Sequence, residues 1–340
     1  MANELEIIAA IRRRAAKQTE RLSLGIGDDA AIIEQNGAKD LLACCDVSVE
    51  NVHFRKLWMP PRLIGRKALA VTLSDIAAMG GTARFALVSI AIPASLLAAD
   101  IDEVFAGIFD YADACDVAVI GGDTSSSPQG LFIDTIALGE CRRGKAITRA
   151  GARPGDLLFV TGTLGAAELG WRFLERGERL QGDESVPSDK AVDKLIQSAI
   201  RKHLIPQPQL EFGKRLGEGE LATAMIDVSD GLSTDLHHLL EESQCGAVID
   251  AKLAPVADSV STLAFKEFHI EPLIIVLRSG EEYELLFTVK PENREKVFAL
   301  ASELNIQVTA IGEITEGNEL KLARDGKVEI IQPSGYEHKM

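Results

Sequence analysis

The stretch IDVSDG at residues 226–231 constrains the fold of this chain most, because it crowds two carboxylates and a hydroxyl into one tight turn. A short apolar run precedes it over residues 221–225, and leucines follow it at helical spacing over residues 232–240. The pattern predicts a strand, a turn and the start of a helix. Because the turn holds no lysine or arginine, its carboxylates repel each other unless a cation or hydrogen bonds offset the charge. The alternative is a helix cap, in which Ser229 or Asp230 accepts hydrogen bonds from the first N–H groups of the helix.

A second pair of carboxylates, Asp28 and Asp29, lies in the glycine-rich sequence GIGDDA at residues 25–30, which we expect to be a turn entering a strand. The spacing loosely matches the G-x-G-x-x-A fingerprint of dinucleotide-binding proteins. However, two carboxylates would then stand where a pyrophosphate needs bare N–H donors. The conflict disappears if the carboxylates hold a divalent metal ion and the ion holds the phosphate. A solvated acidic turn is the simpler alternative.

Three further aspartates stand where a charge is unexpected. Asp46 breaks an apolar strand, and Asp123 follows two glycines at the expected end of another strand. Asp75 lies in a helix expected over residues 62–79 that has almost no other charge near it. A carboxylate beside a buried face must be paired or coordinated. The alternatives are ordinary turn aspartates at the first two positions and, on the helix, an exposed polar stripe shared with Thr72.

Together these positions supply more carboxylates than one structural ion needs. Mg²⁺ usually binds through one or two protein carboxylates and fills its other positions with water and substrate phosphates. The chain has no G-x-x-x-x-G-K-[ST] motif and no H-R-D followed by D-F-G, so it is neither a P-loop enzyme nor a protein kinase. His53, in an expected loop, is a candidate contact to substrate rather than a metal ligand. We therefore expect several metal ions around a polyphosphate, held by Asp28, Asp29, Asp46, Asp75, Asp123, Asp227 and Asp230.

The chain has 340 residues, too many for one ordinary core, and the sequence GARPGD at residues 151–156 is typical of a domain boundary. We expect an N-terminal domain over residues 1–150 and a C-terminal domain over residues 151–340. Strands and helices mix without strict β-α-β alternation, which predicts an α+β fold with sheets covered on one face. A polar segment at residues 176–189 is expected to be a surface loop, and whether it closes over a site stays open. The other strands are expected at 41–49, 85–92, 117–120, 131–138, 157–161, 245–249, 283–289 and 306–314, and the other helices at 4–14, 101–115, 164–175 and 291–304, with more helices up to about 216.

Charge and cysteine usage narrow the partners and the compartment. With 36 Lys and Arg against 51 Asp and Glu, the net charge of −15 argues against a binder of nucleic acid or of anionic membranes. A small phosphorylated ligand is compatible with this charge where metal ions screen the site. The 5 cysteines show no C-x-x-C spacing, which favours a reducing compartment. We expect a cytoplasmic protein, because no apolar run reaches about 18 residues and the N-terminus lacks a signal-peptide pattern.

Assembled along the chain, these stretches resemble the thiamine-monophosphate kinase family, within the wider group of aminoimidazole-ribotide-synthetase-like ATP-binding enzymes. The matching segments follow the family's order and similar spacing over nearly the whole chain, which is more specific than any one motif. They are GIGDDAA from residue 25, DVSVENVHF from 46, KALAVTLSDIAAMG from 67, GGDT from 121, TRAGA from 148, IDVSDGL from 226 and SGEEYEL from 279.

The resemblance implies transfer of a phosphoryl group from ATP to thiamine monophosphate, with several Mg²⁺ ions. It implies an N-terminal mixed sheet with helices on one face, dimerising through the sheet into a homodimer, and a C-terminal α/β sandwich that completes the cleft. In family terms, Mg²⁺ would be held by Asp29, Asp46, Asp75, Asp123, Asp227 and Asp230, beside Asp28, Cys44 and Cys45. ATP would be contacted by Gly122, Asp123, Arg149 and Ser229, and the thiamine moiety by His53, Glu281 and Tyr336.

The chain departs from the family pattern at a few positions. Cys44 and Cys45 stand where Ser or Thr is usual, so side-chain help to a metal there is in doubt while carbonyl help is not. Glu282 replaces a usual Asp, and Asn51 a usual Gly. Because the acceptor phosphate is already ionised near neutral pH, we expect direct transfer with no general base and no covalent nucleophile.

Three rival functions stay open at this point. Selenophosphate synthetases use an N-terminal cysteine or selenocysteine, and hydrogenase-maturation proteins use a C-terminal cysteine. The first cysteine here is Cys44 and the chain ends in HKM, which argues against both. The third rival, a non-catalytic nucleotide-binding module, would have little need of so many metal ligands.

Overall fold

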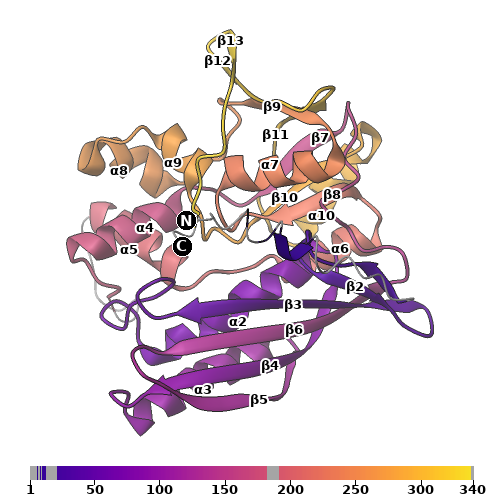
Figure 1. Cartoon of the computed structure of the whole chain (residues 1–340). Coiled ribbons are helices and arrows are strands. Elements are labelled where there is room, and N and C mark those ends of the chain that lie inside the picture. Colours follow the sequence, from indigo (N-terminus) through magenta and orange to yellow (C-terminus); the bar gives the residue numbers. More distant parts are fainter. Residues whose placement is uncertain (1–5, 7, 9, 13–20, 182–190, 338–340) are drawn as a thin grey trace.

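Two mixed β-sheets, one from each half of the chain, organise the structure, which is a computed structural model (Figure 1). It describes residues 6, 8, 10–12, 21–181 and 191–337. The N-terminal sheet lies in the lower part of Figure 1, and the C-terminal sheet lies above it. None of the helices in these described ranges combines the length and the apolarity that a membrane span requires.

The N-terminal sheet has six strands in the order β1-β2-β3-β6-β4-β5. Strands β4 and β5 are parallel and are joined through helix α3, whereas the other neighbouring strands are antiparallel. Its strands are β1 (Leu22–Leu24), β2 (Ala31–Glu34), β3 (Lys39–Val49), β4 (Thr82–Pro93), β5 (Ala118–Ser127) and β6 (Phe132–Arg142), and its helices are α2 (Pro61–Ala78) and α3 (Ala98–Ala114).

Helices α2 and α3 cover the same face of this sheet (Figure 1). Alternate residues of β4 show the consequence: Ala86 and Val88 are buried beneath the helices, whereas Phe85 is 45% exposed on the opposite face. Val47 of β3 and Phe132 of β6 are exposed on that opposite face as well. We call it the open face, defined by Val47, Phe85 and Phe132. The expected mixed sheet with helices on one face is confirmed.

The C-terminal sheet has seven strands in the order β13-β12-β9-β11-β7-β10-β8. Strands β9 and β12 are parallel, and the remaining neighbours are antiparallel. The strands are β7 (Leu157–Thr161), β8 (Ala222–Asp227), β9 (Gly246–Asp250), β10 (Leu285–Val289), β11 (Val308–Thr315), β12 (Leu320–Arg324) and β13 (Lys327–Ile330). The helices are α4 (Ala166–Arg176), α5 (Ala191–Leu204), α6 (Leu210–Glu218), α7 (Leu232–Ser243), α8 (Asp258–Phe268), α9 (Pro272–Arg278), the 3₁₀ turn η1 (Pro291–Asn293) and α10 (Arg294–Glu303).

Strand β10 is buried along its whole length because both faces of the C-terminal sheet are covered. Leu286 packs into a core with Leu236 of α7. Its neighbour Phe287 packs into a second core, stacked on Phe159 with ring centroids 5.5 Å apart and edge-on to Phe212 of α6. An α/β sandwich results, as expected. The prediction that helices cover only one face of each sheet is correct for the N-terminal sheet. It is wrong for the C-terminal sheet, where a continuous apolar strand, β10, is buried on both faces.

Helix α2 lies between the two halves of the molecule and is buried on nearly all sides. It packs on β3 and β6 of the first sheet and on α6 and β8 of the second part. The contact with α6 is close, because a Cβ built at Gly213 would lie 2.3 Å from the carbonyl oxygen of Ala77. The helix begins with Pro61, which suits a first helical position, and ends before Gly80 at φ +66°. Beyond its first turn, where Arg62 is exposed, a charged side chain on α2 such as that of Lys67 is therefore placed in the interior.

Several local predictions differ from the structure. Strand β3 runs through Asp46 without a break, because β6 continues to pair with it. Strand β5 does not end before Asp123 but continues to Ser127 alongside β4. Strands β12 and β13 and helices α8 and α9 were not predicted. The helix expected over residues 4–14 and the loop expected over 176–189 fall largely outside the described residues.

Candidate active site

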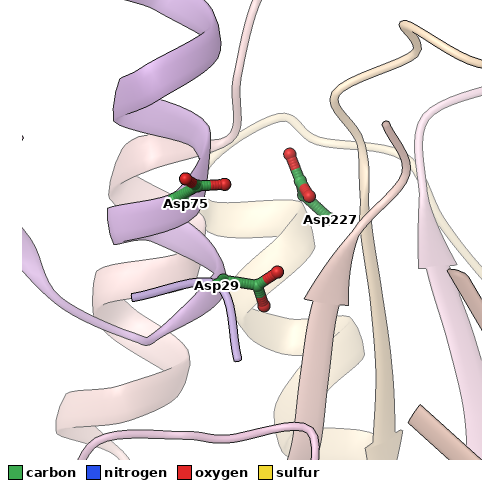
Figure 2. A group of neighbouring side chains, drawn as sticks. All are labelled: Asp29, Asp75 and Asp227. Carbon is green, nitrogen blue, oxygen red and sulfur yellow. The ribbon is translucent and has the colours of Figure 1, made fainter. Parts of the chain in front are cut away.

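Three aspartates from distant parts of the chain meet at one point, and Figure 2 shows their carboxylates turned toward a shared space. Asp29 lies in the loop before β2, Asp75 on helix α2, and Asp227 at the end of β8. One carboxylate oxygen from each lies within 4.8 Å of the other two. The central feature predicted from the sequence, convergence of separate carboxylates, is therefore present for these three residues.

Hydrogen bonds from neighbouring residues hold two carboxylates of this cluster, those of Asp29 and Asp227, and also that of Asp28. Arg149 Nη2 donates to Asp29 Oδ1 at 2.6 Å, and the Arg149 backbone N–H donates to Asp28 Oδ2 at 3.0 Å. Ser74, one residue before Asp75 on α2, donates its hydroxyl to Asp227 Oδ2 at 2.5 Å. Helix α2 thus supplies one carboxylate and orients a second. The guanidinium of Arg149 offsets only part of the negative charge.

Burial and mutual repulsion disfavour ionisation of these groups. Burial and the charge of Asp29 raise the pKa of Asp227 to about 8 and that of Asp28 to about 7. Burial raises the pKa of Asp46 to about 6, with Asp134 and Asp29 adding to the effect. Burial and the charge of Asp46 raise the pKa of Asp75 well above its ordinary value. Asp46 therefore belongs to the same electrostatic cluster as the three converging carboxylates.

The donor set fits a divalent cation that prefers oxygen ligands. Within the described chain, Asp29 Oδ2 and Asp46 Oδ2 are buried and accept no hydrogen bond. Buried carboxylate oxygens without partners are costly, and an ion of opposite charge removes both the repulsion and the missing contacts. Mg²⁺ takes oxygen ligands of this kind. Asp28, Asp29, Asp46, Asp75 and Asp227 are thus suited to hold such ions.

The turn after β8 is built differently from a simple helix cap. The N-cap of α7 is Gly231 at φ +132°, and neither Ser229 nor Asp230 makes the capping hydrogen bond that was the alternative interpretation. Instead, Asp235 Oδ2 accepts hydrogen bonds from the backbone N–H groups of Asp230, at 3.1 Å, and Gly231, at 2.9 Å. Ser229 and Asp230 both line the neighbouring cavity.

Two other segments fix this turn from outside. The Glu281 N–H donates to Ser229 O at 2.7 Å, and the Tyr336 N–H donates to Asp230 O at 2.9 Å. Gly335 must be glycine for this approach, since a Cβ there would lie 2.2 Å from the Asp230 carbonyl oxygen. The turn, the loop after α9 and the C-terminal segment therefore form one wall.

A cavity of about 650 Å³ opens beside the carboxylate cluster. Its lining also includes both tryptophans of the chain, Trp58 and Trp171, and it is large enough for a drug-sized ligand. In the described chain, His53 Nδ1 accepts a hydrogen bond from the Val49 N–H at 3.0 Å, which leaves Nε2 as the protonated nitrogen of the neutral ring. Of the residues predicted for the site, eight line this cavity: Asp46, His53, Asp75, Asp227, Ser229, Asp230, Glu281 and Tyr336.

Four other residues predicted for the site do not line this cavity in a single copy of the chain: Gly122, Asp123, Cys44 and Cys45. Gly122 and Asp123 lie on the edge strand β5, are exposed, and are not part of the cavity lining. Cys45 projects from β3 on the exposed side of the sheet. The Cys44 thiol instead packs against α2, where Sγ lies 3.4 Å from Thr72 O, and burial raises its pKa. The thiolate form that binds metals is disfavoured there.

Four residues of the site region were not predicted: Ser74, Asp235, Lys67 and His203. Lys67 and His203 line the cavity and contact Glu281. Lys67 carried the same signal that identified Asp75, a lone charge in an apolar helix, so that criterion could have found it. Ser74, Asp235 and His203 carry no local signal, because their partners are recognised only once distant segments have folded together.

Comparisons with known proteins show which family the chain is similar to. Two family models match the chain, AIR synthase related protein, N-terminal domain over residues 27–141, and AIR synthase related protein, C-terminal domain over residues 153–325. The thiamine-monophosphate kinase of Escherichia coli K12 is 36% identical over 344 residues, covering 98% of this chain and 98% of that protein. The thiamine-monophosphate kinase of Bacillus subtilis strain 168 is 32% identical, covering 99% of both.

A solved structure described as AaThiL complexed with AMPPCP and TMP superposes with a TM-score of 0.83 at 29% sequence identity. The match covers 99% of this chain and 97% of that chain. The likeness therefore extends over both sheets and over the cleft between them.

Proposed function

The chain belongs to the thiamine-monophosphate kinase family, and from that premise we propose that it transfers the γ-phosphoryl group of ATP directly to the phosphate of thiamine monophosphate, giving ADP and thiamine diphosphate. Family membership makes it an ATP-dependent kinase. The observation that carries the proposal is the meeting of Asp29, Asp75 and Asp227 at the edge of a cavity large enough for the substrates.

We propose that Mg²⁺ ions are held by Asp29, Asp46, Asp75 and Asp227, with Asp28 and Asp230 beside them. When bound, Mg²⁺ neutralises phosphate charge and so removes the main obstacle to the approach of two anions. Orphaned oxygens of Asp29 and Asp46 and the raised pKa values of the cluster support this assignment. Carbonyl help from Cys44 and Cys45 is part of the same proposal.

The protein's own residues position the two substrates. Arg149 and Ser229 are proposed to face ATP, and His53, Glu281 and Tyr336 to face the thiamine moiety. An acceptor phosphate oxygen is already ionised near neutral pH, so the reaction needs no strong general base. We therefore propose in-line transfer with no phosphorylated enzyme intermediate.

Gly122 and Asp123 contribute to ATP and metal binding in this proposal only if a second copy of the chain supplies them. They lie on the edge strand of the N-terminal sheet, outside the cavity of their own chain. We propose a homodimer formed through the open face, where Val47, Phe85 and Phe132 are exposed. The division into domains at residues 150 and 151 belongs to the same proposal, as does a cytoplasmic location, which the five free cysteines support.

A coupled ADP-release assay tests the proposal. Purified protein is supplied with ATP and Mg²⁺ and with thiamine monophosphate, thiamine or an unrelated phosphomonoester as acceptor. We expect ADP release only with thiamine monophosphate, with thiamine diphosphate as the product. ADP release with thiamine but not with thiamine monophosphate, or ATP binding with no ADP release for any acceptor, would overturn it.

A further inference from the structure

Glu281 is held by two residues from distant helices. Lys67 of α2 places Nζ 2.8 Å from Glu281 Oε1, and His203 of α5 places Nδ1 3.0 Å from Glu281 Oε2. The side chains of Lys67 and His203 are only 6% and 7% exposed, whereas that of Glu281 is 27% exposed. All three line the cavity described above. Lys67 thus contacts one carboxylate oxygen of Glu281 and His203 contacts the other, while part of the carboxylate faces the cavity.

The charges of the three residues are balanced. Burial opposes ionisation of Glu281, but Lys67 and His203 outweigh it and hold the pKa of this carboxyl far below its usual range. Burial and the charge of Lys67 lower the pKa of His203, so the imidazole is neutral at neutral pH. Glu281 therefore remains a carboxylate whose charge is offset by Lys67, unlike the aspartates of the metal cluster. Its role is better suited to accepting hydrogen bonds than to holding a cation.

The backbone restrains Glu281 as firmly as the side-chain contacts. Glu281 has φ +58° and Tyr283 has φ +51°, a left-handed conformation that costs about 1 kcal/mol or more for residues other than glycine. The loop is held there by the Glu281 N–H to Ser229 O bond of 2.7 Å and by the Tyr283 N–H to Val228 O bond of 2.8 Å. These bonds tie Glu281 to the same turn that carries Asp227 and Asp230.

We propose that Lys67 and His203 are positioning residues that fix the Glu281 carboxylate to accept a hydrogen bond from an amino group on the heteroaromatic ring of the phosphate acceptor. A carboxylate oxygen has two acceptor positions; Lys67 Nζ takes one on Oε1, whereas His203 Nδ1 lies 3.0 Å from Oε2 without making a hydrogen bond. The remaining positions select an N–H donor and reject a carbonyl at the same place on the ring. The inference rests on the proposed function, whose acceptor carries an aminopyrimidine.

The test compares Lys67→Met with wild-type protein in the ADP-release assay. Loss of a charge-assisted contact that orients a bound group is expected to raise KM for thiamine monophosphate by about 10- to 100-fold. KM for ATP is expected to change less than about 3-fold, because the ATP-facing residues Arg149 and Ser229 are untouched. An unchanged KM for thiamine monophosphate would overturn the inference.

A second readout separates positioning from a structural role. An acceptor analogue that carries a ring carbonyl in place of the amino group is expected to be a poor substrate for wild-type protein. Lys67→Met is expected to narrow the ratio of kcat/KM between acceptor and analogue by about 10-fold, and His203→Leu to do the same. His203→Asn, whose amide keeps a polar group beside Glu281 Oε2, is expected to retain the wild-type ratio. An equal ratio in all four proteins would contradict the inference.

If Lys67→Met alone fails to fold because Glu281 is left as an unpaired buried charge, the double variant Lys67→Met/Glu281→Gln removes that charge and is measured instead. It is expected to fold and to show the raised KM for thiamine monophosphate and the narrowed ratio. A folded double variant with wild-type KM and ratio would overturn the inference. Absence of ADP release by wild-type protein would instead reject the proposed function, so the two failures are distinguishable.

Discussion

Replacing Asp227 by Asn is expected to change stability and activity in opposite directions. Asp227 is 2% exposed, and burial together with Asp29 raises its pKa to about 8. Asparagine keeps the shape of the side chain and an oxygen that can accept the Ser74 hydroxyl. Because burial disfavours its charged form and Asp29 and Asp46 repel it, Asp227 must take up a proton on folding at pH 7, and asparagine removes that cost, so the metal-free protein should become more stable. It also removes a proposed metal ligand, so turnover should be lost.

The size of the stability change follows from the pKa. The ordinary pKa of this group is 3.8, so it is ionised in the unfolded chain at pH 7 but protonated in the folded chain. Taking roughly 1.4 kcal/mol per pH unit, the interval from 3.8 to 7 corresponds to about 4 kcal/mol that the folded state loses at pH 7. Because the repulsion is shared among several aspartates, we expect the variant to gain about 1 to 4 kcal/mol.

Urea unfolding of metal-free protein at pH 7, followed by circular dichroism, measures this gain. Because the folded-state pKa of Asp227 is raised, the gain should be fully present near pH 8 and should disappear as the pH falls toward 4. Asp116→Asn makes the same chemical change at a side chain that is 98% exposed and should shift stability by less than about 0.5 kcal/mol. A destabilised Asp227→Asn protein, or one that retains normal turnover, would refute the reasoning.

Three other substitutions test the packing, the open face and the buried histidine. Gly213→Ala places a Cβ 2.3 Å from Ala77 O and should lower the free energy of unfolding by about 1 to 3 kcal/mol in urea titrations; an unchanged value would show that α6 and α2 are less tightly packed. Phe85→Asp puts a charge on the open face and should convert the proposed dimer to monomer in analytical ultracentrifugation, whereas Leu97→Asp, at an exposed site outside the sheet, should leave it a dimer. Dimers in both variants would argue against the open face as the interface. Because the pKa of buried His203 is lowered from 6.5, the unfolded chain takes up a proton that the folded chain does not, so wild-type stability should fall as the pH drops below about 6.5. His203→Gln should reduce that fall between pH 7 and pH 5, and an equal fall in both proteins would contradict the assignment.

The sequence predicted the carboxylate cluster well where the signal is local. Asp75 stands out as a charge in an apolar helix, and burial of α2 between the two sheets explains why that signal is reliable. Asp29 and Asp227 stand at the ends of short apolar runs, and both turns occur where predicted. That carboxylates from separate segments converge could be inferred only from their shared chemistry. The structure confirms this convergence for Asp29, Asp75 and Asp227.

Predictions failed where tertiary pairing overrides local pattern. Two glycines before Asp123 suggested the end of a strand, but β4 extends the ladder through that segment. Gly122 is needed there because a Cβ would lie 1.8 Å from Val88 O, so glycine marks a close strand contact and not a turn. The alternative interpretation, a helix cap from Ser229 or Asp230, is wrong, because Asp235 instead accepts hydrogen bonds from the backbone N–H groups of the turn. His203 was missed because its partner Glu281 lies in a distant segment, whereas Lys67 carried the same local signal as Asp75 and could have been predicted.

The central claim is that the converging aspartates hold divalent ions between two phosphorylated molecules, and counting bound ions tests it most directly. Mn²⁺, which binds oxygen-rich sites of the kind that Mg²⁺ occupies, can be counted by electron paramagnetic resonance in the presence of a non-hydrolysable ATP analogue. We predict more than one bound Mn²⁺ per wild-type chain, and the loss of at least one in Asp75→Asn but none in Asp116→Asn. The same number of ions, bound with the same affinity, in wild-type protein and Asp75→Asn would contradict the account.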